Sequence, residues 1–274
     1  MDVLDEEFGA SRVESAIEGV FNFRLDVPSW GFGRGGTRFG TYETADDPKG
    51  WQQRLDAAGS FHRITGQGAH VALHFPWDGD IDSCSKLAET LRLRGLRAGP
   101  VNPNWFSTRG SFDDRLRFGS FTNPIEKLRK ASLDHFDECV AIAKRLESDV
   151  ISVWLPDGTN SPGQMSFFDQ SARLKQSLQT AYAHLEPGMK LFLEYKYFEP
   201  AFYSTAVPDW GTAMAMCQEL GPNAKALVDL GHHPLGVNVE QIVANLLSRK
   251  ARATPFFVFG QNLSLSLLVM PRIQ

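Results

Sequence analysis

Cysteine is scarce in this sequence, and so are long apolar runs. Only three of the 274 residues are cysteine, Cys84, Cys139 and Cys217, and none belongs to a CxxC pair. The odd number and wide spacing argue against a disulfide framework, so we expect buried free thiols in a reducing compartment. No uninterrupted apolar run reaches about 18 residues, which argues against a membrane-spanning helix.

The sequence also lacks an excess of basic residues and a secretory leader. Its 28 Lys and Arg residues are outnumbered by 32 Asp and Glu residues, and the formal net charge is −4. This balance predicts no basic surface for nucleic acid or for an anionic membrane. The acidic start, MDVLDEEFGASRVESAIEG, has neither the basic nor the apolar region of a signal peptide, so we expect a cytoplasmic protein.

Phosphate-binding loops are missing as well. No GxGxxG follows the first predicted strand, and no GxxxxGK[ST] occurs anywhere. The segment GFGRGGTRF (31–39) is rich in glycine but lacks the lysine of a phosphate loop. Nucleotide binding is therefore a weak hypothesis.

What the sequence does contain is a repeated alternation of short apolar runs with longer amphipathic segments. Strands are predicted at 22–30, 70–77, 96–104, 149–155, 190–199 and 224–231. Helices are predicted at 49–63, 81–95, 124–147, 166–186, 209–220 and 237–249. This order predicts parallel βαβ units. Six units at about 40 residues each favour a (β/α)8 barrel, with a doubly wound sheet as the alternative.

Several predicted strands end in polar side chains or tryptophan. Because the active site of a parallel barrel collects at the carboxyl ends of its strands, these side chains are candidate site residues. They are His74, Trp154, Asp157, Glu194, Lys196, Asp229, His232 and His233, with Trp30, Trp77 and Trp105. Carboxylates such as Glu194 and Asp229 suit Mn²⁺ or Mg²⁺, and an added imidazole favours Mn²⁺ or Zn²⁺.

Each candidate also has a structural interpretation. His74 is on an apolar strand, where a histidine is more often part of the core. Glu194 and Lys196 lie two residues apart and could form a buried ion pair. The two histidines after Asp229 could belong to a solvated loop, and the tryptophans could serve packing alone. Asp229 is harder to explain in this way, because a buried carboxylate is costly without a cation or donors.

Five long motifs sharpen the hypothesis. They are VPSWGFGRGGTRF (27–39), ALHFPWD (72–78), VWLPDGTNSPGQ (153–164), EYKYFEPAFYSTAVPDWGT (194–212) and LVDLGHH (227–233). Together they resemble bacterial L-rhamnose isomerases, which have barrels of the xylose-isomerase type. The resemblance spans about residues 20–249. It implies an Mn²⁺-dependent enzyme, or one that uses another divalent cation, which interconverts aldoses and ketoses as a homotetramer.

The resemblance also implies roles for single residues. Glu194 and Asp229 would bind a structural metal, and His232 a second, catalytic one. Lys196 would bind a substrate oxygen, which makes Lys196 and His232 the expected catalytic residues. The expected substrate-binding residues are His74, Trp154 and Phe39, the last on a loop beside a neighbouring subunit's site.

The pattern of the resembling enzymes breaks after residue 249. Their seventh strand carries a GFHFND-like motif, a DDD-like run follows, and the eighth strand adds an aspartate. This sequence has RKARATPFFVFGQNLSLSLLVMPRIQ instead, without Asp, Glu or His after Glu240. We therefore expect a partial barrel domain over 1–249 and an atypical tail over 250–274, with the last strands missing or replaced.

Two explanations of the tail stay open. The coding sequence is altered or truncated there, or the protein has diverged and lost its metal while keeping the carbohydrate-facing half. In either case we expect little isomerase activity, an open barrel with exposed strand edges, and poor solubility. The alternatives are a non-catalytic sugar-binding or assembly fragment, a sugar epimerase, and, disfavoured by the negative charge, a metal-dependent endonuclease.

Overall fold

Eight strands form a closed barrel in the computed structural model of the chain. The structure describes residues 2–21, 24–33, 36–37, 40–41, 48–105, 116, 119–199, 203–248, 256–259 and 267–270. Around the barrel the strands run in the order β1-β12-β11-β10-β7-β6-β5-β4. They are β1 (Arg24–Pro28), β4 (His70–Phe75), β5 (Arg97–Pro103), β6 (Val150–Trp154), β7 (Lys190–Glu194), β10 (Ala224–Asp229), β11 (Phe256–Phe259) and β12 (Leu267–Met270).

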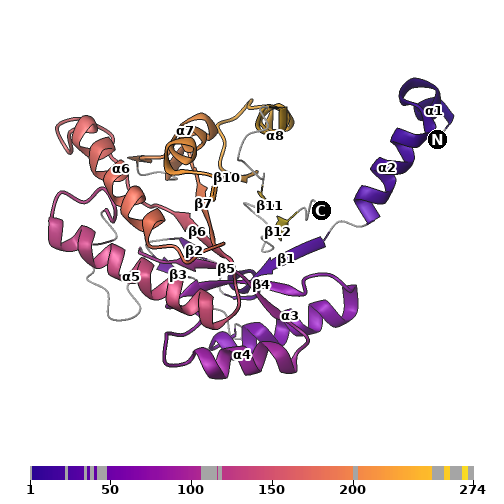
Figure 1. The fold of residues 1–274 in the computed structure, drawn as a ribbon, viewed down its shortest axis with the longest axis horizontal. Coiled ribbons are helices and arrows are strands. Elements are labelled where there is room, and N and C mark those ends of the chain that lie inside the picture. Colours follow the sequence, from indigo (N-terminus) through magenta and orange to yellow (C-terminus); the bar gives the residue numbers. More distant parts are fainter. Residues whose placement is uncertain are drawn as a thin grey trace.

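All barrel strands except β12 are parallel to one another. Helices cover the outside of the barrel (Figure 1). These helices are α3 (Trp51–Thr65), α4 (Cys84–Leu93), α5 (Glu126–Arg145), α6 (Phe167–Ala183), α7 (Trp210–Leu220) and α8 (Val239–Ser248). Short elements complete the described fold: η1 (Ser29–Phe32), β2 (Gly36–Thr37), β3 (Gly40–Thr41), β8 (Phe198–Glu199) and β9 (Tyr203–Ser204). The (β/α)8 prediction is confirmed.

The last two strands correct one expectation. We expected an open barrel, but β11 pairs in parallel with β10, and β12 pairs antiparallel with both β11 and β1. The edges of β1 and β10 therefore both have hydrogen-bonded neighbours. The physical reason is that backbone pairing needs an extended chain and no particular side chain, so the apolar FFVF and LLVM segments can take the seventh and eighth places. The open strand edges from which we expected poor solubility are therefore not present in this eight-stranded sheet.

Side chains on the strands alternate between two apolar layers. Ala72, Val150, Phe192 and Leu227, from four different strands, form a small buried cluster of their own. Their chain neighbours, such as Leu73, Ile151 and Val228, belong instead to the large cluster that includes the helices. Since successive strand residues face opposite sides, the small cluster fills the barrel interior and the large one lies under the helices.

Local sequence signals explain where several helices begin and end. The Ser166 side chain accepts a hydrogen bond from Asp169 N at the start of α6, and Asp209 accepts one from Thr212 N at the start of α7. Helix α3 ends at Gly66, whose φ of 69° suits glycine. Cys84, Cys139 and Cys217 are buried free thiols, as expected.

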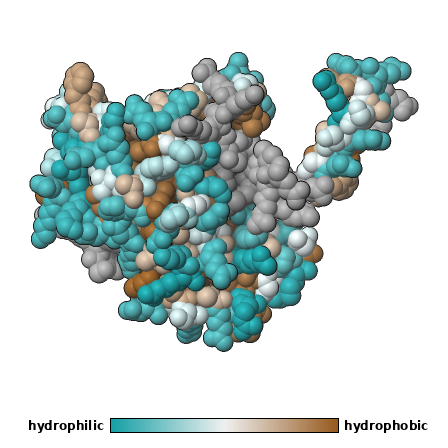
Figure 2. All heavy atoms as spheres, in the orientation of Figure 1, coloured by the Kyte–Doolittle hydropathy of each residue, from teal (hydrophilic) through white to brown (hydrophobic). Residues whose placement is uncertain are grey.

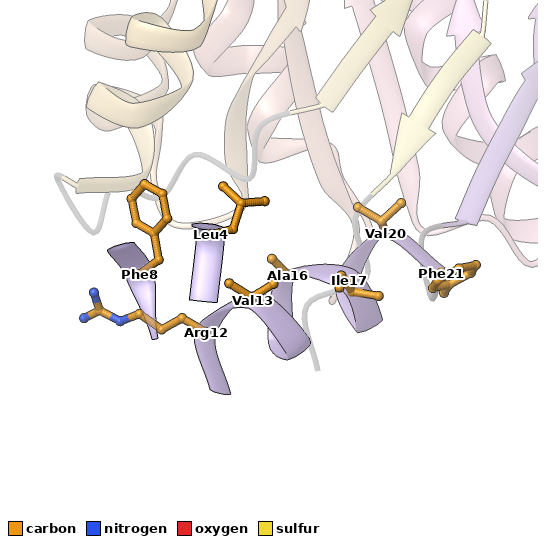
Figure 3. A pocket seen from close by; sticks show the side chains of 8 residues that line it. All are labelled: Leu4, Phe8, Arg12, Val13, Ala16, Ile17, Val20 and Phe21. Atoms are coloured by element: carbon orange, nitrogen blue, oxygen red, sulfur yellow. The ribbon is translucent and has the colours of Figure 1, made fainter. Parts of the chain in front are cut away.

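Two helices before β1 were not predicted from the sequence. α1 (Asp2–Phe8) and α2 (Ala10–Phe21) form an arm that projects from the barrel (Figures 1 and 2). Figure 3 shows the apolar side chains, among them Phe8, Val13 and Ile17, that line a cavity of about 660 Å³ along this arm. No helix in the described parts of the chain combines the length and apolarity needed to cross a membrane.

Candidate metal and sugar site

Four acidic side chains lie at or just beyond the carboxyl ends of the barrel strands, and they have two kinds of environment. Asp78 and Asp157 follow β4 and β6, and both are fully buried. Glu194 and Asp229 are the last residues of β7 and β10. The difference between the two pairs lies in what each carboxylate contacts.

Asp157 is fully satisfied by neutral donors. Its Oδ1 accepts hydrogen bonds from N and Oγ of Ser120, at 2.8 and 2.7 Å. Its Oδ2 accepts them from N and Oγ1 of Thr122, at 2.7 and 2.8 Å. Four such donors compensate a buried carboxylate, so Asp157 holds the 119–123 segment against the end of β6.

Asp78 is also satisfied by protein donors. Its Oδ1 accepts from Arg54 Nη2 at 2.7 Å, and its Oδ2 accepts from His74 N at 2.7 Å and from Ser29 Oγ. The ion pair with Arg54 balances its charge within the fold. Asp78 thus fixes the backbone at the end of β4, where His74 lies.

Glu194 and Asp229 instead converge on one imidazole. Nδ1 of His232 lies 3.1 Å from Oε1 of Glu194, and Nε2 lies 3.3 Å from Oδ2 of Asp229. Ligand-type atoms of these three residues all lie within 4.8 Å of one another. Both carboxylates face the barrel interior, because Phe192 and Leu227, two residues earlier on the same strands, belong to the interior cluster.

The electrostatics of this cluster favour a positive charge. The pKa of the Asp229 carboxyl is raised to about 6, chiefly by burial, which outweighs the lowering effect of His232 and is reinforced by the neighbouring Glu194. Burial alone would lower the pKa of His232, but its hydrogen bond to Glu194 and the Asp229 charge outweigh that effect, so the pKa is raised. A half-buried carboxylate, Glu194, and a buried one, Asp229, around one imidazole are a donor set that fits a divalent cation such as Mn²⁺.

Lys196 and Trp154 lie beside this cluster. The Lys196 side chain is buried, and its Nζ lies 5.2 Å from the centroid of the Trp154 ring, a cation–π distance. Trp154 is directly opposite Glu194 in the register of β6 and β7. An ion pair between Glu194 and Lys196 was the structural alternative for these two residues, and the contact that the structure gives for the Glu194 carboxylate is with His232.

His74 faces the same end of the barrel interior from β4. Its ring stacks on Trp77, with centroids 4.5 Å apart, and meets Trp30 edge to face at 5.2 Å. Burial, with smaller effects from His135 and Arg54, lowers its pKa to about 3. The ring is therefore neutral near pH 7, with one donor and one acceptor nitrogen.

The remaining candidates separate into packing residues and one unplaced residue. Trp105 is buried under α5 and donates a hydrogen bond to Ser132 O, so it serves packing. His233 is turned to Tyr195, so of the two adjacent histidines it is His232 that contacts the carboxylates. Phe39 lies outside the described residues. Tyr195 was missed, although its place between Glu194 and Lys196 predicts that it faces away from them.

Two curated proteins are similar in sequence to most of this chain. A probable sugar isomerase of Rhizobium meliloti is 41% identical over 231 residues, which are 84% of this chain and 54% of that protein. A probable sugar isomerase of Mesorhizobium japonicum is 38% identical over 231 residues, 84% of this chain and 53% of that protein. The chain spans about half the length of these relatives. No family model matches it.

Solved structures share the fold at low sequence identity. A D-allulose 3-epimerase from Methylomonas sp. in complex with D-allulose aligns with a TM-score of 0.58 and 14% identity, over 85% of this chain and 71% of that one. A family 2 AP endonuclease from Brucella melitensis aligns with a TM-score of 0.58 and 14% identity, over 82% and 75%. These likenesses agree with the barrel fold of this chain.

Proposed function

We propose that this chain carries the metal- and sugar-binding half of a metal-dependent aldose–ketose isomerase that acts on L-rhamnose or a related sugar. The observation that carries the proposal is the convergence of Glu194, Asp229 and His232 beside the buried Lys196. The names of the two relatives, both probable sugar isomerases, support the same reaction class. The motifs that resemble L-rhamnose isomerases suggest the sugar.

Glu194, Asp229 and His232 would hold Mn²⁺ or another divalent cation. When bound, such a cation supplies Lewis acidity for neighbouring carbonyl and hydroxyl oxygens. The protein's own part is to hold the three ligands together at the end of the barrel, where Asp229 and His232 are both less than a tenth exposed. His232 and Asp229 must give up their protons before the cation binds.

Other side chains would bind and orient the sugar. Lys196 would donate a hydrogen bond from its ammonium to a sugar oxygen, and Trp154 restrains that ammonium through its ring face. The neutral His74 would hydrogen bond to a hydroxyl group, while Trp30 and Trp77 fix its ring. Phe39 would close the site of a neighbouring subunit in a homotetramer, which sedimentation analysis of the purified chain tests.

We expect the chain by itself to turn over slowly. The strands that complete the barrel, FFVF and LLVM, contain no Asp, Glu or His, so they add no ligating side chain. Three protein ligands leave a divalent cation with several water-filled positions and a weaker hold on two substrate oxygens. The same observation favours the second candidate, a sugar-binding fragment without catalysis.

An assay of the purified chain separates these candidates. L-Rhamnose and other aldoses are incubated with Mn²⁺ and the chain, and ketose formation is followed by chromatography. Slow Mn²⁺-dependent ketose formation that is lost in Lys196→Met supports the isomerase. Sugar binding by calorimetry without any conversion supports the fragment, and an epimeric product from a ketose supports the epimerase. Rapid conversion would contradict the expected slow turnover.

A further inference from the structure

Tyr195 lies between two site residues on the chain but on the opposite side of the barrel wall. Glu194 faces the interior, whereas the Tyr195 side chain is only 1% exposed and belongs to the cluster under the helices. It therefore cannot touch a ligand in the barrel directly. Its contacts run instead to the turn that follows β10.

Besides the contact between Glu194 and His232, three hydrogen bonds join the end of β7 to this turn. Nδ1 of His232 lies 3.1 Å from Tyr195 O, and Tyr197 N donates to His232 O at 3.3 Å. The Tyr195 hydroxyl is hydrogen bonded to Nε2 of His233 at 2.7 Å, with the two rings edge to face. Two of the three bonds thus come from Tyr195, one from its backbone and one from its side chain.

The backbone contact determines which nitrogen of His232 can bind a cation. A carbonyl oxygen only accepts hydrogen bonds, so the nitrogen that faces Tyr195 O carries the proton. Nε2 faces the Asp229 carboxylate, so it is the nitrogen that would give up its proton and offer its lone pair when a cation replaces that proton. A hydrogen bond of this kind, from the second nitrogen of a ligand histidine, orients the ring and increases its basicity.

The side-chain contact holds the backbone that carries His232. His233 follows His232 directly, and within the turn Gly231 N donates to Oδ1 of Asp229 at 2.6 Å. The turn is therefore held at one end by the Asp229 carboxylate and at the other by the Tyr195 hydroxyl. Without that hydroxyl the His233 ring loses its hydrogen-bond partner at Nε2.

We propose that Tyr195 is a positioning residue for the metal site, through its hydroxyl bond to His233 and its carbonyl contact with His232. The proposal rests on the proposed function, because it presupposes that Glu194, Asp229 and His232 hold a divalent cation. Tyr195→Phe removes the hydroxyl and keeps the ring and the carbonyl. It should weaken the cation's hold on the chain without unfolding it.

The test measures Mn²⁺ affinity by calorimetry and the visible absorption of bound Co²⁺, which reports ligand geometry. Tyr195→Phe should raise the Mn²⁺ dissociation constant about 10-fold, the lower end of what the loss of such a partner costs. It should also shift the Co²⁺ spectrum. His233→Leu should have the same effect, the double variant should be no worse than either single one, and His233→Gln should recover most of the affinity.

Tyr182→Phe is the matched control. The Tyr182 hydroxyl accepts a hydrogen bond from Asn223 N, which precedes β10 and so lies at the opposite end of that strand from Asp229. It should leave the Mn²⁺ affinity and the Co²⁺ spectrum unchanged. Equal affinities of wild type and Tyr195→Phe would overturn the positioning role alone, whereas a wild-type chain that binds no cation would overturn the proposed function with it.

Discussion

Nε2 of His232 lies 3.3 Å from Oδ2 of Asp229, and Nδ1 of the same ring lies 3.1 Å from Oε1 of Glu194. A protonated His232 thus supplies the positive charge that balances the buried Asp229 and the half-buried Glu194. A divalent cation would compete with that proton for the same carboxylates.

Asp229→Asn should abolish stabilisation by Mn²⁺. At a free Mn²⁺ concentration of 100 times the dissociation constant, binding stabilises the wild type by about 2.7 kcal/mol. This corresponds to a rise in Tm of roughly 5–10 °C for a domain of this size. The amide that replaces the carboxylate carries no negative charge to bind the cation. The Tm of the Asp229→Asn variant should therefore not change when Mn²⁺ is added. Melting curves with and without Mn²⁺ measure the effect.

Asp157→Asn is the control for that substitution. Its carboxylate is equally buried but contacts Ser120 and Thr122 rather than His232. The variant should melt at a lower temperature than the wild type and still gain stability from Mn²⁺. An Mn²⁺ response that survives in Asp229→Asn would contradict the assignment of Asp229 as a ligand.

Mn²⁺ affinity should fall as the pH is lowered through about 6. Burial raises the pKa of Asp229 to about 6, and the neighbouring carboxylates raise the pKa of His232. Both groups therefore hold protons at mildly acidic pH and must release them to bind a cation, which weakens binding up to about tenfold per pH unit for each proton released. Calorimetry at pH 5.5, 6.5 and 7.5 tests this. An affinity that does not change with pH would show that the cation displaces no proton from Asp229 or His232.

His74 should make folding stability depend on pH. Its pKa is lowered from 6.5 to about 3 in the folded chain, chiefly by burial. Between these values the unfolded chain binds a proton that the folded chain excludes, so stability is lost as the pH falls below about 6.5. The loss should approach 1.4 kcal/mol per pH unit, about the energy of one pKa unit.

Urea unfolding of wild type and His74→Gln between pH 7 and pH 4 measures this loss. The variant cannot titrate in this range, so its stability should decline less steeply. His184→Gln, at an exposed histidine paired with Asp137, is the control and should follow the wild type. If the free energy of unfolding fell equally steeply with pH in His74→Gln and in the wild type, the lowered pKa of His74 would be contradicted.

Asp157→Ala should destabilise the fold by about 3 kcal/mol or more, because it leaves buried donors of Ser120 and Thr122 without an acceptor. The urea midpoint should fall accordingly. Ser177→Ala, which removes one buried hydroxyl bond to Phe121 O, should cost only about 1 kcal/mol. If both variants lost a similar free energy of unfolding, the hydrogen bonds of Asp157 would stabilise the fold no more than one buried hydroxyl bond does.

Most of the strand and helix positions could be predicted from the sequence. The strand predicted at 149–155 is β6, Val150–Trp154, and the helix predicted at 166–186 is α6, Phe167–Ala183. Periodicity works here because each strand has one face in the barrel and one under a helix. The arm of α1 and α2 was missed, since its apolar side chains are not part of the barrel core.

The sequence by itself determined the alternation of strands and helices, the inward direction of Glu194 and Asp229, and a tail without ligating side chains. Those properties depend on local periodicity and composition. Only the tertiary structure decided that β12 closes the barrel antiparallel, that Asp78 and Asp157 are satisfied by donors, and that His232 rather than His233 faces the carboxylates. These outcomes depend on which distant groups meet in space, and chain spacing does not specify that.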